Sequence, residues 1–208
     1  PAQDLGALMI HFSTDYVYDG RKPTPYTEDD EPAPLNAYGR SKLAGDRAVQ
    51  EECERHLIFR TSWIYGNRGD NFLRTIQKLA QEQKEIRVVD DQFGAPTWSR
   101  AVAGAVAEVL AKATTVGNLN HAYLRERLGL YHLTASGSAS WYEFGKQIVD
   151  HLQLQTRIVP VASMTMRQTA GRPLNSRLDC AKGEEKFGIN MTSWRDDLSM
   201  CLANRRPA

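Results

Sequence analysis

Tyr38 and Lys42 stand four residues apart in the run Tyr38-Gly-Arg-Ser-Lys42, within a segment whose pattern predicts a helix. At that spacing two side chains project from one helix face, so a phenol and an ammonium can share a site. A free tyrosine has a pKa of about 10, and a neighbouring ammonium favours its ionised form. Such a pair suits proton transfer to a carbonyl oxygen while hydride reaches the carbonyl carbon. Alone the pattern is weak, because this spacing often arises by chance.

A second polar group lies where that chemistry needs it. Thr14 and Asp15 follow the continuous apolar run Leu8-Met-Ile-His-Phe12, which is typical of a strand buried on both faces of a parallel sheet. Ligands of open α/β sheets bind at the carboxyl ends of the strands. We therefore expect Thr14 to hydrogen-bond a substrate carbonyl beside Tyr38. The competing interpretations are a threonine bonded to its own backbone and an aspartate that only forms a turn.

The segments that would position these residues alternate between strand and helix patterns. Residues 18–35, rich in Gly, Pro, Asp and Glu, predict an exposed loop, after which Asn36 can cap a helix over about 37–54. The remaining predicted elements are strands at 57–59, 86–89, 131–133 and 157–161, helices at 71–83, at 98–113 (capped by Thr97) and at 141–152 (capped by Ser140 or Ser138), and a last helix opened by Ser193-Trp-Arg-Asp196.

This order predicts an α/β fold, namely part of a Rossmann-like, doubly wound parallel sheet with a small C-terminal mixed α/β substrate lobe. We assign residues 1–115 to the later part of the nucleotide-binding domain, which carries the catalytic residues and lends some segments to the lobe. Residues 116–208 are mainly the lobe. The stretch 114–120 marks this boundary only weakly.

Composition excludes several classes of protein. The 26 Lys and Arg residues nearly balance 25 Asp and Glu, which leaves no broad basic field for nucleic acid or an anionic membrane. The apolar runs are too short to span a bilayer, and no signal-peptide pattern opens the chain. The three cysteines and the histidines show no metal-ligand or redox spacing. We expect a cytoplasmic protein without a metal site.

Five segments resemble the extended short-chain dehydrogenase/reductases that act on nucleotide sugars, and among these the dTDP-4-dehydrorhamnose reductases. Thr14, Tyr38 and Lys42 match the active-site threonine, tyrosine and lysine of the family. The segments are Phe12-Ser-Thr-Asp-Tyr-Val-Tyr-Asp-Gly20, Asn36-Ala-Tyr-Gly-Arg-Ser-Lys-Leu-Ala-Gly45, Arg60-Thr-Ser-Trp-Ile-Tyr-Gly66, Asp91-Gln-Phe-Gly-Ala-Pro-Thr97 and Arg172-Pro-Leu-Asn-Ser-Arg-Leu-Asp179.

The resemblance implies reduction of the 4-keto group of dTDP-4-dehydro-L-rhamnose by NADPH, or less favourably NADH, to give dTDP-L-rhamnose for cell-surface polysaccharide. Tyr38 would donate the proton, Lys42 would tune it and bind the nicotinamide ribose, and Thr14 would hold the keto oxygen. Related 4,6-dehydratases typically carry Asp-Glu after the catalytic threonine, whereas Tyr16 follows Asp15 here. That difference favours reduction over elimination of water.

Further residues are candidates for binding the dTDP-sugar. Asp15 and Trp63 match positions that contact the sugar in the family, and an indole at a strand end also offers a flat apolar wall for a deoxysugar. Arg172 could meet the diphosphate, since a guanidinium suits phosphate oxygens. For Trp63 the alternative is ordinary packing, and for Arg172 a solvated loop position.

Two other functions stay open, a non-catalytic regulatory or binding subunit and a nucleotide-sugar epimerase that uses the same tyrosine and lysine. A homodimer is also an expectation, because some members of the family are thought to dimerise through a magnesium ion held just after the Ala-Pro-Thr segment. Arg100 occupies that neighbourhood here, which argues against a metal-bridged contact.

The family's nucleotide-binding fold opens with a strand, a Gly-x-x-Gly-x-x-Gly turn and a helix whose amino end receives the pyrophosphate. The 208 residues contain no such turn, since Gly66-Asn-Arg-Gly69 lacks the third glycine. The resemblance places Leu8–Phe12 at about the fifth strand of the family's sheet. We therefore expect this chain alone to hold the cofactor's phosphates poorly and to show little NADPH-dependent activity.

Overall fold

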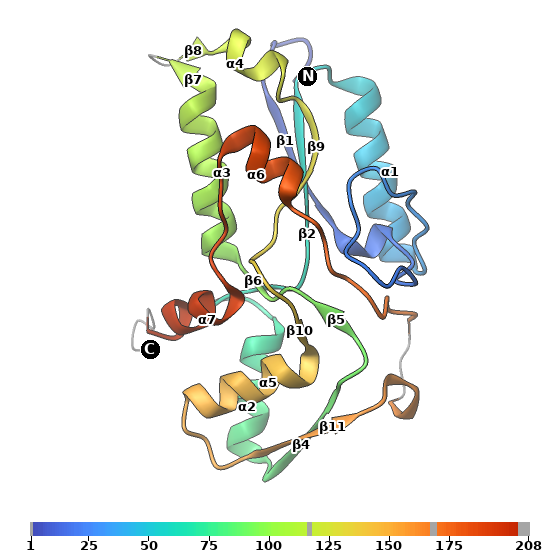
Figure 1. Cartoon of the computed structure of the whole chain (residues 1–208), viewed down its shortest axis with the longest axis vertical. Coiled ribbons are helices and arrows are strands. Elements are labelled where there is room, and N and C mark those ends of the chain that lie inside the picture. The colour runs from blue at the N-terminus through green and yellow to red at the C-terminus, as the bar shows by residue number, and fades with distance from the viewer. Residues whose placement is uncertain (1, 116–117, 167–169, 204–208) are drawn as a thin grey trace.

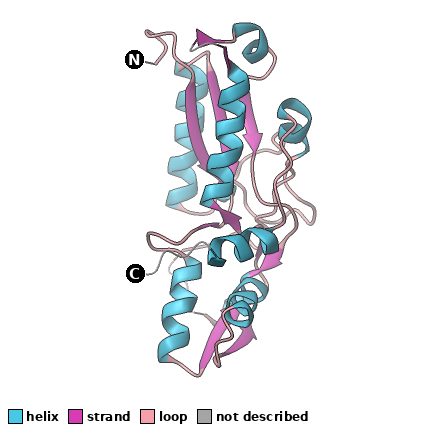
Figure 2. Cartoon of the chain, turned by 90° about the vertical axis from the view of Figure 1, so that its left-hand side faces the viewer, coloured by secondary structure: helices cyan, strands magenta, loops and turns pink. Residues whose placement is uncertain are grey.

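The computed structural model describes residues 2–115, 118–166 and 170–203. Two parts lie one above the other along the longest axis, a sheet between helices and a smaller part of helices and short strands (Figure 1). The same division is visible after a 90° turn (Figure 2). The predicted α/β class with parallel strand pairs is confirmed.

The upper part is built on a parallel sheet in the order β1-β2-β9. β1 (Met9–Thr14) pairs with β2 (His56–Thr61), whose other side pairs with β9 (Gly129–His132). Helices α1 (Ala37–Glu52) and α3 (Ser99–Ala113) flank the sheet on opposite sides (Figure 1). Within the described residues β1 is an edge strand. The prediction that this strand is buried on both faces was wrong, because Met9, Ile10 and His11 are only half-buried and Phe12 is 44% exposed.

The lower part contains α2 (Phe72–Glu82), α5 (Trp141–His151) and the parallel pair of β4 (Glu85–Val89) and β11 (Arg157–Val161). Shorter elements link the two parts or lie at their edges. These are η1 (Asp15–Val17), β3 (Ile64–Tyr65), β5 (Phe93–Gly94), β6 (Thr97–Trp98), β7 (Thr114–Thr115), β8 (Asn118–Leu119), α4 (His121–Arg125), β10 (Ala139–Ser140), η2 (Ser163–Thr165), α6 (Ala181–Phe187) and α7 (Trp194–Ala203).

Apolar side chains form separate cores in the two parts. Phe59 and Tyr131 belong to the core between the upper sheet and α3, whereas Phe144 and Trp194 belong to the core of the lower part. Strand pairs β2–β9 and β4–β11 each join residues from opposite sides of the predicted boundary at 115. Residues 116 and 117, where that boundary falls, lie outside the described residues, and the boundary stays a prediction.

The residues at the starts of the helices can be compared with the predicted caps. Asn36 caps α1 as predicted, and of the two candidates at α5 it is Ser140 that caps the helix, in a complete capping box with Glu143. Asn71, predicted as the first helical residue, instead caps α2. Thr97 does not cap α3, so that prediction was wrong. Its hydroxyl instead donates to the carbonyl of Ala95 and accepts from a backbone N–H of the segment after β9.

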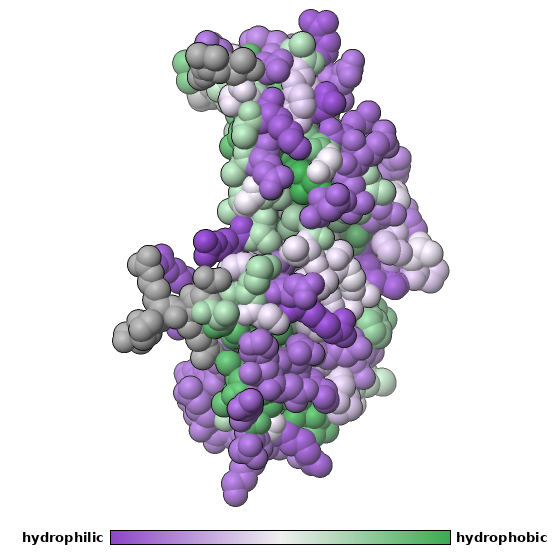
Figure 3. Space-filling view, turned by 60° about the vertical axis from the view of Figure 1, so that its left-hand side comes forward, coloured by the Kyte–Doolittle hydropathy of each residue, from purple (hydrophilic) through white to green (hydrophobic). Residues whose placement is uncertain are grey.

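The surface on the α3 side mixes hydrophilic and hydrophobic residues (Figure 3), in keeping with the near balance of charges. In the described ranges no helix is both long enough and apolar enough to cross a membrane.

Candidate active site

The carboxyl end of β1, the short helix η1 and the first turns of α1 bring the predicted catalytic side chains to one edge of the sheet. Lys42 Nζ donates to the carbonyl oxygen of Phe12 at 2.6 Å, two residues before Thr14. The Thr14 hydroxyl accepts from the N–H of Tyr16 at 3.2 Å. The ring of Tyr16 meets that of Tyr38 edge-on, with centroids 5.8 Å apart. Tyr38 itself is 55% exposed, so its phenol is open to a ligand.

A close backbone approach fixes the first turn of α1 against η1. The N–H of Gly39 donates to the side chain of Asn36 at 2.8 Å, which caps the helix. A Cβ on Gly39 would lie 2.1 Å from the carbonyl oxygen of Tyr16. Only glycine fits between these two backbones, and the residue before it is Tyr38.

Asp15 is a wholly enclosed carboxyl next to Thr14, with a relative exposure of 3%. Its Oδ1 accepts the Thr14 hydroxyl at 3.0 Å, whereas its Oδ2 has no partner of hydrogen-bonding geometry among the described residues. Burial raises the pKa of Asp15 to about 7, although the hydroxyls of Ser176 and Thr14 oppose the shift. An enclosed acceptor without a partner is costly unless a ligand satisfies it.

Trp63 follows the end of β2, at the same edge of the sheet, because Thr14 is in register with Thr61. Its backbone has φ of +48°, a left-handed conformation that is uncommon for a large side chain and that recurs at functional sites. The indole stacks on that of Trp141 with centroids 3.5 Å apart, and Gly94 lies against its other ring atoms. Only 8% of Trp63 is exposed. The predicted flat wall is therefore largely covered, mainly by Trp141.

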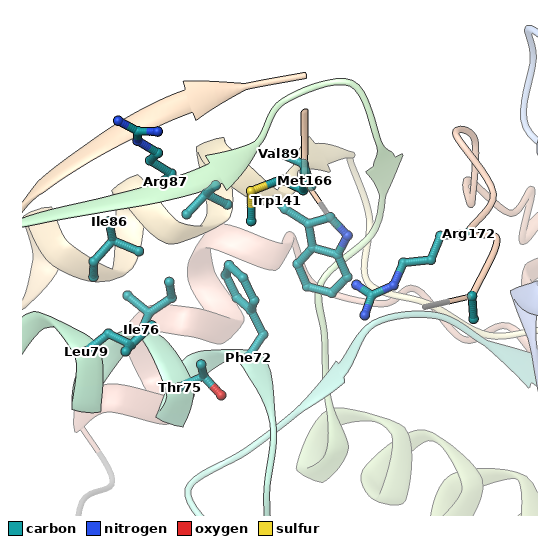
Figure 4. Close-up of a pocket in the computed structure, with 12 residues that line it drawn as sticks. Phe72, Thr75, Ile76, Leu79, Ile86, Arg87, Val89, Trp141, Met166 and Arg172 are labelled. Carbon is teal, nitrogen blue, oxygen red and sulfur yellow. The ribbon is translucent and has the colours of Figure 1, made fainter. Parts of the chain in front are cut away.

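A cavity of about 510 Å³ opens in the lower part, beside this indole pair. Trp141 and Arg172 stand at one end, and Figure 4 shows the guanidinium directed toward the indole. Apolar side chains of α2 and β4, together with Met166, form most of the remaining wall. The cavity thus combines an aromatic surface with a cationic group, which suits a ring system that carries phosphate.

Backbone hydrogen bonds hold the segment after Arg172 between the two parts. The N–H of Asn175 donates to Gly20 O at 3.2 Å, and the N–H of Ser176 donates to Phe93 O at 2.7 Å. Gly20 allows this approach, because a Cβ there would lie 2.6 Å from Pro173. The segment consequently brings Ser176 to Asp15 and Arg172 to the cavity.

Sequence reasoning missed Trp141 and Ser176 as candidate site residues. Trp141 was only the first residue of a predicted helix, and Ser176 lay unremarked inside a family-like segment. Neither has a local signal, because each reaches the site through contacts between segments far apart in the chain. In the part of the chain that is described, no group of three or more His, Cys, Asp or Glu residues could hold a metal ion.

Comparisons with known proteins agree with this geometry. Residues 1–206 match the family model of the RmlD substrate binding domain. The chain is 42% identical, over 212 residues, to the dTDP-4-dehydrorhamnose reductase of Burkholderia thailandensis, covering 95% of the chain and 68% of that relative. The chain belongs to the dTDP-4-dehydrorhamnose reductase family.

Other members of the dTDP-4-dehydrorhamnose reductase family are also similar to nearly the whole of this chain, which covers about two thirds of their own length. The reductase of Escherichia coli K12 is 38% identical over 200 residues, which cover 93% of the chain and 64% of that relative. The crystal structure of the Bacillus anthracis reductase in complex with NADP matches with a TM-score of 0.89 and 33% identity, over 98% of this chain and 68% of that one. The chain therefore spans about two thirds of the length of these reductases.

Proposed function

We propose that this chain carries the catalytic and sugar-nucleotide-binding part of an NADPH-dependent reductase, which reduces the 4-keto group of dTDP-4-dehydro-L-rhamnose to give dTDP-L-rhamnose for polysaccharide synthesis. One observation carries the proposal: Tyr38, Lys42 and Thr14 are joined, through Tyr16 and Phe12, at the carboxyl end of β1. The proposed substrate is taken from the name of the Burkholderia thailandensis relative, and the proposed cofactor from the NADP complex of the Bacillus anthracis reductase.

Each of these side chains has a distinct role in the proposed reaction. The nicotinamide, when bound, supplies the hydride to the carbonyl carbon. The Tyr38 phenol donates its proton to the oxygen that becomes the hydroxyl. Lys42 Nζ uses one N–H on Phe12 and has two left, enough for ribose hydroxyls and for stabilising the phenolate that the transfer leaves. The residues present thus fit the nicotinamide end of the cofactor.

Thr14 must change its hydrogen bond to take part. Its hydroxyl proton points to Asp15 Oδ1, so it can polarise the keto oxygen only after it turns away from that carboxyl. A substrate hydroxyl that donates to Asp15 Oδ2, which has no partner of hydrogen-bonding geometry among the described residues, would satisfy the carboxyl and favour this turn.

The sugar nucleotide is proposed to extend from this edge past Trp63 into the cavity. The edge of the Trp63 indole, rather than its face, would contact the deoxysugar. Arg172 would meet the diphosphate, and the base would lie against Trp141. This places the reacting carbon at Tyr38 and the nucleotide in the lower part.

The deciding experiment incubates a family-length version of the protein with NADPH and a dTDP-4-keto sugar. Loss of NADPH absorbance together with formation of the 4-hydroxy sugar supports the reductase. Isomerisation without NADPH consumption would indicate an epimerase. Substrate binding without either reaction would indicate a binding subunit.

We further propose a cytoplasmic homodimer. The three cysteines are free thiols, which is in keeping with a reducing compartment. The dimer is proposed from the family resemblance alone, and sedimentation analysis of the purified protein tests it.

A further inference from the structure

The helix that carries the catalytic pair has little apolar surface to fix its rotation. Of the 16 residues of α1, only Gly39, Leu43 and Asp46 are buried. Ala44 and Ala48, two of its apolar residues, are exposed. Tyr38, Lys42 and Asp46 fall in one i, i+4, i+8 row, so the direction of the buried Asp46 also sets the direction of the other two.

Asp46 is held by a buried cation. Its Oδ2 accepts from Arg60 Nε at 3.1 Å, and the two side chains are 1% and 4% exposed. The other oxygen lies 3.3 Å from Nε2 of His11, whose pKa is lowered by burial and by Lys42. Arg60 stands on β2, which pairs on both sides, so Asp46 is tied to the central strand of the sheet.

Arg60 is held in turn by a directional chain of buried groups. Its NH1 donates to the Tyr18 hydroxyl at 2.8 Å, and that hydroxyl lies 2.9 Å from Nε2 of His132. Nδ1 of His132 lies 3.1 Å from the carbonyl oxygen of Asp179, which can only accept. The neutral imidazole therefore carries its proton on Nδ1, which leaves Nε2 as an acceptor for the Tyr18 hydroxyl. That hydroxyl also has the carbonyl oxygen of Thr27 as an acceptor at 3.0 Å. Burial lowers the pKa of His132 to about 3, so the imidazole stays neutral at neutral pH.

We propose that Asp46 and Arg60, braced by Tyr18 and His132, are positioning residues that set the rotation of α1 and thereby aim Tyr38 and Lys42 at the substrate. The inference rests on the proposed function for its consequence in catalysis. Its structural content, that a buried polar anchor orients this helix together with the Gly39 contact and the packing of Leu43, stands independently of the reaction. A buried ion pair adds little stability over an apolar pair of the same volume, so a role in orientation explains this pair better than a role in stability.

The test replaces the anchor by apolar side chains, in the double variant Asp46→Leu/Arg60→Met. We expect a melting temperature close to that of the wild type, displaced amide NMR signals at Tyr38 and Lys42, and a kcat about 10- to 100-fold lower with little change in KM. As a control, Lys146→Met/Asp150→Leu removes an exposed ion pair on α5 and should change none of these. Wild-type amide signals at Tyr38 and Lys42 together with wild-type stability would overturn the inference.

A second pair of variants decides the question if the double variant does not fold. Tyr18→Phe removes the hydroxyl that braces Arg60 and that also bonds Thr27 O. Tyr131→Phe removes another buried hydroxyl, which donates to Arg127 O at 2.9 Å away from α1. We expect both to lose similar stability but only Tyr18→Phe to displace the Tyr38 signal and lower kcat. Equal effects of the two would refute the positioning role. The kinetic measurements use the family-length protein. If its wild type lacked reductase activity, that would count against the proposed function only, and the NMR signals would then decide the inference.

Discussion

At the scale of single residues, the close contact at Gly39 connects backbone geometry to catalysis. Gly39→Ala would force a Cβ to within 2.1 Å of Tyr16 O, so α1 must move away from η1. We expect a loss of roughly 1–3 kcal/mol of stability. We also expect the protein that remains folded to lose reductase activity, because Tyr38 moves with the turn. Chemical denaturation and initial rates measure the two effects.

Gly104→Ala is the matched control for that substitution. Gly104 lies in α3, and no atom lies within 4 Å of the Cβ it would gain. Helix propensity predicts a gain of about 0.5–1 kcal/mol and unchanged activity. Equal behaviour of the two alanine variants would show that the contact of Gly39 with Tyr16 does not constrain the site.

Asp15 predicts a pH dependence with a definite sign. Between its ordinary pKa of 3.8 and the folded value of about 7, the folded chain keeps a proton that the unfolded chain has lost. This carboxyl therefore contributes most stability below about pH 4, and the contribution is lost as pH rises to about 7. Asp15→Asn removes the titration, so its stability relative to wild type should rise across that window by a few kcal/mol, at about 1.4 kcal/mol per pKa unit.

Denaturation of both proteins at several pH values measures this difference. The quantity to compare is the free energy of unfolding of the variant minus that of the wild type at each pH. His132, with its pKa lowered to about 3, makes the stability of both proteins rise with pH in the acid range, and the difference removes this shared effect. A difference that stays flat from about pH 4 to 7 would contradict the raised pKa of Asp15.

At the scale of elements, α5 links the cavity to the strand pair below it. Ser140 caps this helix, and its hydroxyl also donates to Asp90 at the end of β4. Ser140→Ala should cost roughly 1–2 kcal/mol and weaken dTDP binding, because Trp141 is the next residue. Ser138→Ala is the control, since its side chain does not cap α5. Calorimetric titration with dTDP checks the prediction, and equal affinities of the two variants would exclude the link.

The elements also show where sequence reasoning succeeds. The caps at Asn36 and at Ser140, the latter with Ser138 as the alternative, could be predicted because a cap depends on residues three positions apart. Thr97 resembled a cap but is drawn into contacts with Ala95 and Ala135 instead. The paired short strands β3–β6 and β5–β10 and the helix α6 were not predicted, because two to seven residues are too few to show a period.

At the scale of the whole molecule, the α/β class and the family followed from the sequence, whereas the shape of the site did not. Tyr38, Lys42 and Thr14 were found from a helix spacing and a strand end, which are local features. The covering of Trp63 by Trp141 and the approach of Ser176 to Asp15 depend on how the lower part docks onto the sheet. No local pattern encodes that docking.

The most direct test of the central claim is the kinetics and substrate binding of Tyr38→Phe in the family-length protein. Phenylalanine keeps the ring beside Tyr16 and removes only the phenol oxygen. We predict that turnover falls by about 100-fold or more while the affinity for the dTDP-sugar stays within about threefold of wild type. Retained turnover would contradict the assignment of Tyr38 as the proton donor.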